Sequence, residues 1–332
     1  MSYALRRVVE ISSEHGVAHA LKRTLSYLCK PIGPLSGYND NVLYARGIAP
    51  ALGVLSSSLV GTNLYKSYRR RREGNPILTP VNDYALYVDV NDAGISNELL
   101  LYGYHELLST NAFREALREL ERGADKPVTV LEVGANLGYF VMLEATVLHP
   151  DVRIHAFEPV PRTADLLEMN VAANGYEDCV TIVPAAVSSQ PGTAAFAVTA
   201  SSNKNYLLEG DGRPDPAGVQ STFEVETVAI DEYLATNEIR PHEIDVVRMD
   251  IQGHEYEVLR GMRSVLEADG ELLLFLETHG RKRDEIVEML QRAGFELLHA
   301  ADNFRELQTT ASIDDLRHQD GEFILRRPAN DP

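Results

Sequence analysis

Short runs of apolar residues alternate with amphipathic segments over the last two thirds of the chain. The apolar runs lie at 128–133, 153–157, 180–183, 244–249 and 271–276. Segments with helical periodicity separate most of them, near 139–148, 161–173, 254–268 and 282–293. Buried strands joined by helices predict an α/β fold with a doubly wound, mostly parallel sheet. Two further strand patterns, at 295–299 and 322–326, are joined without a long helix and bring the expected number of strands to seven. They predict an antiparallel hairpin at the sheet edge.

The first part of the chain has a different pattern. Apolar residues recur at helical spacing over 2–29 and over 54–72, and a short alternating strand follows at 84–90. Residues 97–120 are typical of helices interrupted at Gly103. We therefore predict a mainly helical, basic N-terminal extension or lid over residues 1–120 and one α/β domain over residues 121–332. Within that domain, the Gly- and Pro-rich run 190–218 is expected to be a surface insertion rather than core.

Charge is also unevenly distributed along the chain. The chain carries 31 Lys and Arg against 49 Asp and Glu, a formal net charge of −18. Residues 1–80 hold 11 basic and 4 acidic residues, a net of +7, so the remainder has a net charge of −25. An acidic α/β domain repels phosphates, which argues against a nucleic-acid partner. Arg69, Arg70, Arg71 and Arg72 end a predicted helix and favour contact with an anionic membrane or a lipid-linked glycan. A solvated helix end is the alternative.

Cysteine usage and hydropathy indicate the cellular setting. Cys29 and Cys179 are the only cysteines, so neither a disulfide framework nor a zinc site is predicted. The start of the chain lacks the uninterrupted apolar run of a secretory signal. The most apolar later stretch, 48–60, is shorter than the roughly 20 residues that a membrane-spanning helix needs. These features predict a cytoplasmic protein, with peripheral membrane contact through the four arginines as a further hypothesis.

The first strand-to-helix turn of the α/β domain indicates a ligand site. It reads Glu132-Val-Gly134-Ala-Asn136-Leu-Gly138, and its glycines allow close approach of a ligand to a helix N-terminus. Asn136 takes the place of the second glycine in the dinucleotide fingerprint and would crowd a pyrophosphate. Glu158 ends the second strand, where its carboxylate can accept hydrogen bonds from two ribose hydroxyls. S-adenosylmethionine fits this pattern, whereas the alternative is a tight turn and a solvated strand end.

Further motifs extend this pattern along the chain. They are Phe157-Glu158-Pro159, Asn170, Asn174-Gly175, Thr227-Val-Ala-Ile-Asp231, Asp250-Ile-Gln-Gly253-His-Glu255 and Glu277-Thr-His279. Together with the turn, and over about residues 92–295, they resemble the FkbM-type S-adenosylmethionine-dependent methyltransferases. That family usually has Lys-x-Asp-x-Glu-Gly where this chain has Arg248, Asp250 and Gln252, so one carboxylate is missing. The resemblance implies a Rossmann-like class I methyltransferase fold. The cofactor contacts that we expect are Glu132, Gly134, Asn136, Gly138, Glu158, Ala185 and Asp250.

The acceptor is expected at the tips of the fourth and fifth strands, because ligands of open parallel sheets lie beyond the carboxyl ends of the strands. Asp250, His254 and Glu255 follow the fourth strand, and Glu277 and His279 follow the fifth. A sugar hydroxyl is a poor nucleophile and needs a positioned base. We predict that Asp250 orients the acceptor hydroxyl or the cofactor amine, and that His254 or His279 is the base.

Structural roles for these residues remain open. Asp250 and Glu255 can instead cap the following helix, and each histidine can be structural or solvated. Oxygen-rich metal coordination by Asp250, Glu255, Glu277 and His279 is chemically conceivable. Because sequence proximity to strand tips is not coordination geometry, no metal is predicted.

The function that we predict is O-methylation of a sugar hydroxyl or uronic acid in a surface glycan or glycolipid, with the glycan implied by the resemblance. A small-molecule hydroxyl, as in secondary metabolism, is the first alternative. A nucleotide-dependent oxidoreductase is disfavoured by Asn136. The last alternative is a non-catalytic scaffold that binds an adenosyl ligand and docks on anionic surfaces through Arg69–Arg72.

Overall fold

The computed structural model describes residues 48–60, 63–123, 126–208, 218–280, 282–302, 305–306 and 312–329. These residues form two compact units. The first includes the described residues up to Asn82 together with Leu86–His105, and the second includes Asp83–Ala85 and the described residues from Glu106 onward. The helices predicted over residues 2–29 lie outside the described residues.

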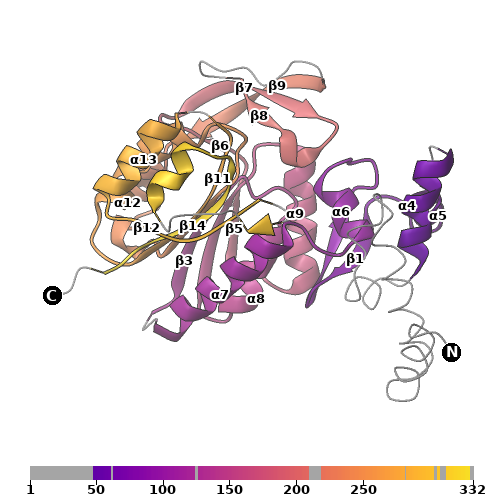
Figure 1. The fold of residues 1–332 in the computed structure, drawn as a ribbon, viewed down its shortest axis with the longest axis horizontal. Coiled ribbons are helices and arrows are strands. Elements are labelled where there is room, and N and C mark those ends of the chain that lie inside the picture. Colours follow the sequence, from indigo (N-terminus) through magenta and orange to yellow (C-terminus); the bar gives the residue numbers. More distant parts are fainter. Residues whose placement is uncertain are drawn as a thin grey trace, which may run out of the picture. The chain divides into compact units, whose positions relative to one another are not determined.

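The second unit is built on one large sheet (Figure 1). Five neighbouring strands that extend to one edge are parallel, and toward the other edge two long strands pair antiparallel with each other. The strand order is β13 (Arg305–Glu306), β12 (Glu296–Asp302), β14 (Gly321–Arg327), β11 (Leu272–Thr278), β10 (Val246–Met249), β3 (Val128–Val133), β4 (Val152–Phe157) and β5 (Val180–Val183). The predicted doubly wound sheet with an antiparallel edge is thus confirmed, and the short β13 is added to its seven strands. The chain direction across the sheet reverses between β3 and β10, which places the ligand crevice of such folds at their carboxyl ends.

Helices flank this sheet. They are α7 (Leu107–Gly123), α8 (Tyr139–Leu148), α9 (Pro161–Asn174), α10 (Ile230–Thr236), α11 (Glu255–Gly261), α12 (Arg263–Glu267) and α13 (Arg283–Arg292). The helix expected over 254–268 is two helices, because the backbone leaves helical geometry at Met262. Every residue of β3 and β10 is buried, as expected for central strands covered on both faces.

A second, four-stranded sheet follows β5. Its order is β6 (Ala186–Val187), β9 (Val219–Val228), β7 (Gly192–Thr199) and β8 (Tyr206–Leu207). The run 190–218, expected to be a surface insertion outside the core, instead contains the strands β7 and β8. Phe196 and Leu207 of these strands are buried in an apolar cluster. Three alanines in β7 made its alternation of apolar and polar residues too weak to recognise.

Among its described residues, the first unit contains two helices, a hairpin and a third helix. They are α4 (Ile48–Val60), α5 (Leu64–Glu73), β1 (Ile77–Val81), β2 (Tyr84–Val88), whose first residues belong to the second unit, and α6 (Ile95–Leu101). The single helix expected over 54–72 is thus two, and the second begins where the Asn63 side chain accepts a hydrogen bond from the Lys66 amide. Helix α7, which the predicted boundary at residue 120 assigned to the extension, is part of the second unit. None of the described helices has both the length and the apolar character needed to cross a bilayer.

Candidate functional site

The turn between β3 and α8 depends on glycine. Gly134 has φ +83°, and a Cβ there would lie 2.5 Å from the backbone oxygen of Asp250. Gly138 has φ +92° at the start of α8, and a Cβ there would lie 2.5 Å from Leu167 Cδ1. A side chain at Gly134 would therefore push against the backbone of Asp250, and one at Gly138 would push against the Leu167 side chain. Gly134 thus brings the turn against the tip of β10, and Gly138 brings the start of α8 against α9.

Glu158 lies beyond the end of β4 with its carboxylate held by backbone amides. The Asn136 amide donates to Oε2 and the Val160 amide donates to Oε1, both at 2.9 Å. Burial raises the pKa of Glu158 to about 7, against the effect of these two hydrogen bonds. Each carboxylate oxygen has two lone pairs, so each keeps one for a ligand hydroxyl.

A cavity at the carboxyl ends of the strands brings most of the predicted residues together. Those that line it are Gly134, Asn136, Glu158, Ala185, Asp250 and His254. Among the described lining residues neither Glu132 nor Gly138 is found. The cavity is also lined by residues of β7, of β8 and of the segment between them, which the sequence did not predict: Phe196, Ser202, Asn203, Asn205 and Leu207. The polar sequence between β7 and β8 is typical of a loop, so nothing in it predicted that these residues line the cavity.

The structure places Glu132 in the core of the sheet. It is fully buried, and Arg248 Nη1 on the neighbouring strand donates to its Oε1 at 2.8 Å. The guanidinium Cζ of Arg248 lies 3.5 Å from the ring centroid of Phe140 and 5.0 Å from that of Phe275. Burial raises the pKa of Glu132 to about 7, although the charge of Arg248 acts in the opposite direction. This geometry suits an internal ion pair that holds β3 against β10, rather than a contact with a cofactor.

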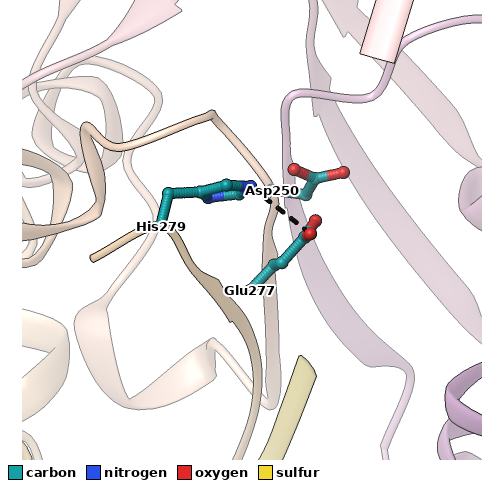
Figure 2. Close-up of side chains that lie close together, drawn as sticks. All are labelled: Asp250, Glu277 and His279. Atoms are coloured by element: carbon teal, nitrogen blue, oxygen red, sulfur yellow. Dashed lines mark ion pairs between the residues drawn. The ribbon is translucent and has the colours of Figure 1, made fainter. Parts of the chain in front are cut away.

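Asp250, Glu277 and His279 cluster at the tips of β10 and β11 (Figure 2). His279 lies between two carboxylates, with Nδ1 2.9 Å from Glu255 Oε1 and Nε2 3.3 Å from Glu277 Oε1. Burial lowers the pKa of His279, but hydrogen bonds to Glu255 and Glu277 outweigh it and raise the pKa to about 11. In this arrangement His279 is a cation at neutral pH, so it has no free nitrogen to take a proton.

Asp250 and Glu277 have opposite protonation tendencies. Burial acts to raise the pKa of Asp250, yet the hydrogen bond with Glu277 and the charges of Arg248 and His279 lower it. Gln252 Nε2 also donates to Asp250 Oδ1 at 3.0 Å. Burial and the charge of Asp250 raise the pKa of Glu277 well above its ordinary value. The pair therefore places an anionic Asp250 in the cavity wall beside a neutral Glu277.

Ligand-type oxygen atoms of Glu106, Glu277 and Glu322 also lie within 4.8 Å of one another, as do the ligand atoms of Asp250, Glu277 and His279. Carboxylates in this number can hold a divalent cation. Arg248 and His279 already supply positive charge to the cluster. The absence of a metal stays a prediction.

His254 and Glu255 have local partners. His254 Nε2 lies 2.9 Å from Ser188 Oγ, and the ring forms part of the cavity wall. Glu255 is buried at the start of α11, where its Oε1 accepts the Gly253 amide at 2.8 Å as well as His279. Glu255 thus orients the histidine and the turn before the helix, while His254 faces the cavity.

Comparisons with known proteins place the chain among methyltransferases. Residues 132–297, half of the chain, match the family model of the methyltransferase FkbM domain. Hexuronic acid methyltransferase AglP of Haloferax volcanii is 26% identical over 186 residues, which cover 54% of this chain and 68% of that protein. The solved structure of methyltransferase FkbM from Methylobacillus flagellatus is 14% identical with a TM-score of 0.35, covering 71% of this chain and 56% of that chain. Precorrin-6y C5,15-methyltransferase from Geobacter metallireducens is 14% identical with a TM-score of 0.36, covering 65% and 86%.

The cavity fits the methyl donor of this family. Gly134 lines the cavity, and Glu158 has lone pairs available for ribose hydroxyls. Asn136 occupies the turn where a pyrophosphate would need glycine. The chain belongs to the FkbM methyltransferase family and is an S-adenosylmethionine-dependent methyltransferase.

Proposed function

We propose that the enzyme methylates an oxygen of a sugar, a hydroxyl or the carboxylate of a hexuronic acid, in a surface glycan or glycolipid. The observation that carries the proposal is the anionic Asp250 in the cavity wall beside the turn at Gly134. The hexuronic acid methyltransferase of Haloferax volcanii supports the sugar class. Methyltransferase family membership argues against the oxidoreductase and scaffold alternatives.

In the proposed reaction the bound cofactor supplies a methyl group on a positively charged sulfur. With a hydroxyl acceptor, Asp250 would accept a hydrogen bond from the hydroxyl and take its proton as the oxygen–methyl bond forms and the methyl–sulfur bond breaks. Because a carboxylate with a low pKa is a weak base, proton transfer accompanies methyl transfer rather than preceding it. Glu277 and Gln252 hold the Asp250 carboxylate in place, and alignment of the oxygen with the methyl–sulfur axis supplies much of the acceleration.

The experiment that tests the acceptor is mass spectrometry of glycans and glycolipids from cells with and without the gene. We expect one sugar to lose one methyl group, and re-expression of the wild-type chain, but not of Asp250→Asn, to restore it. Unchanged glycans together with a small molecule that loses a methyl would contradict the sugar acceptor and favour the small-molecule alternative.

Glu158 is proposed to bind the ribose hydroxyls, which makes cofactor affinity depend on pH. Its pKa of about 7 means that the accepting carboxylate form is lost as pH falls through 7. The affinity for S-adenosylhomocysteine should decrease by up to about tenfold for each pH unit below 7. Isothermal titration calorimetry from pH 8 to pH 6 measures this. Glu158→Gln should bind more weakly with a flat profile, and a flat profile in the wild type would contradict the ribose contact.

Peripheral membrane contact of a cytoplasmic enzyme is proposed for the first unit. Arg70, Arg71 and Arg72 are exposed at the end of α5. Large apolar side chains on α4 and α5 are also exposed, Leu52 by 58% and Leu64 by 59%. Basic and apolar groups together favour an anionic lipid surface. Co-sedimentation with vesicles containing phosphatidylglycerol should exceed that with neutral vesicles and should fall when the three arginines are replaced by glutamine; equal sedimentation would exclude the contact.

A further inference from the structure

An asparagine of the small sheet presents an unused hydrogen-bond acceptor at the cavity. Asn203 lies in the short 3-10 helix η2 (Ser202–Lys204) between β7 and β8 and lines the cavity. Its side-chain Oδ1 is buried and has no hydrogen-bond partner within the part of the chain that the structure describes. Buried polar atoms are nearly always paired, because leaving one unpaired is costly. An unpaired acceptor in a cavity wall therefore points to a ligand that donates a hydrogen bond.

The surroundings of Asn203 fix its position. Phe196 of β7 and Leu207 of β8 belong to a buried apolar cluster that also contains Val160 and Ala186, which follow β4 and β5. Asn205 lines the same cavity, but its Oδ1 accepts the Thr199 amide at 2.8 Å and so serves the local backbone. Asn203 is thus an acceptor that the local structure does not use, on a segment packed against the end of β4.

Strand order limits which part of the cofactor Asn203 can meet. If Glu158 binds the ribose, as proposed above, the sugar lies at the tip of β4. Because the methyl group must face an acceptor held by Asp250, the amino-acid part would extend to the β3 and β10 side, where Gly134 and Asp250 line the cavity. The base then extends to the opposite side, toward β5 and Ala186, where the small sheet forms the wall. At that end the donor that adenine offers is its 6-amino group.

We propose that Asn203 recognises the adenine base of the cofactor, with Oδ1 accepting a hydrogen bond from the 6-amino group. The side-chain NH2 of Asn203 can donate to N7 at the same time, which is the bidentate pattern by which asparagine reads adenine. Asn203 is then a binding residue that sets cofactor specificity. A 6-oxo base is rejected because its oxygen would face the Asn203 oxygen, acceptor against acceptor.

Calorimetric binding of S-adenosylhomocysteine and of its deaminated analogue, S-inosylhomocysteine, tests this. The wild type should bind the analogue at least about tenfold more weakly, since a buried polar group is left unpaired. Asn203→Leu should bind S-adenosylhomocysteine about tenfold more weakly and lose the preference between the two ligands. Asn203→Asp keeps the acceptor and should keep the preference. Lys204→Ala, an exposed neighbour in the same short helix, is the matched control and should match the wild type.

Equal affinity of the wild type for both ligands, or an unchanged preference in Asn203→Leu, would overturn the assignment. Failure of the cofactor site itself has a different signature, because the wild type would then bind neither ligand. Glu158→Gln should weaken both ligands equally, which separates the ribose contact from the base contact. If circular dichroism shows that Asn203→Leu is unfolded, the relative affinities of the wild type and of Asn203→Asp for the two ligands still test the assignment.

Discussion

Asp250→Asn is expected to lower kcat for methyl transfer by about 10²–10⁴-fold, the usual loss when a positioned general base is removed. The substitution keeps the size of the side chain and an oxygen that can accept from Gln252, so the fold and the cavity should persist. The amide cannot take a proton from the acceptor hydroxyl. The rate at saturating cofactor and acceptor, measured beside the affinity for S-adenosylhomocysteine, should show a large loss of kcat with little loss of binding.

The pH dependence of kcat distinguishes Asp250 from the histidines. The pKa of Asp250 is held below its ordinary value, so its carboxylate is the basic form throughout the neutral range and kcat should be flat from pH 5.5 to 8. A histidine base of ordinary pKa would instead lose activity below about pH 6.5. His254→Gln and His279→Gln should each retain much more activity than Asp250→Asn. If His254→Gln abolishes turnover while Asp250→Asn does not, His254 is the base.

Most strands of the large sheet could be predicted from the sequence because they are continuous apolar runs. The run at 128–133 coincides with β3, a central parallel strand buried on both faces. The run at 180–183 coincides with β5, an edge strand that is only partly buried but is still a continuous apolar run apart from one threonine. Burial on both faces also made it impossible to predict which face of β3 carries Glu132. In a strand buried on both faces, alternation does not show which face a side chain occupies, and the partner of Glu132 lies 116 residues away on β10. The pairing of Arg248 with Glu132 needs the register of the sheet, which no local pattern encodes.

The residues that line the cavity also differ in whether the sequence could predict them. Glu158 could be predicted because it directly follows a recognisable strand in chain order. Asn203 could not, because the short β8 brings it to the cavity through pairing with β7. The protonation of His279 was equally out of reach, since it depends on Glu255 and Glu277 lying on either side of the ring. Local motifs thus predicted the residues at the strand tips. Tertiary contacts determine which residues of the small sheet line the cavity and how His279 is protonated.

Arg248→Met is expected to lower the free energy of unfolding by about 3–5 kcal/mol, the usual cost of removing one partner of a buried ion pair. Methionine keeps much of the volume between the Phe140 and Phe275 rings, so the loss comes mainly from the charge. Glu132 then remains fully buried without its cation, next to the buried Glu144. Urea unfolding monitored by circular dichroism measures the change. The control Arg260→Met removes an exposed partner of Glu257 and should cost less than about 1 kcal/mol.

The loss in Arg248→Met should also depend on pH in a direction that identifies its cause. The pKa of Glu132 is raised to about 7 in the folded wild type, so its burial is least costly when it is protonated. Removing the arginine raises that pKa further, because the charge that stabilised the carboxylate is gone. The folded variant therefore takes up a proton that the unfolded chain releases near its ordinary pKa, and stability falls as pH rises through the interval between the two. The difference between Arg248→Met and wild type should be larger at pH 8 than at pH 5.5, and Glu132→Gln in the same chain should remove most of that pH dependence. An equal loss at both pH values would mean that packing between the rings, rather than charge, is the contribution of Arg248.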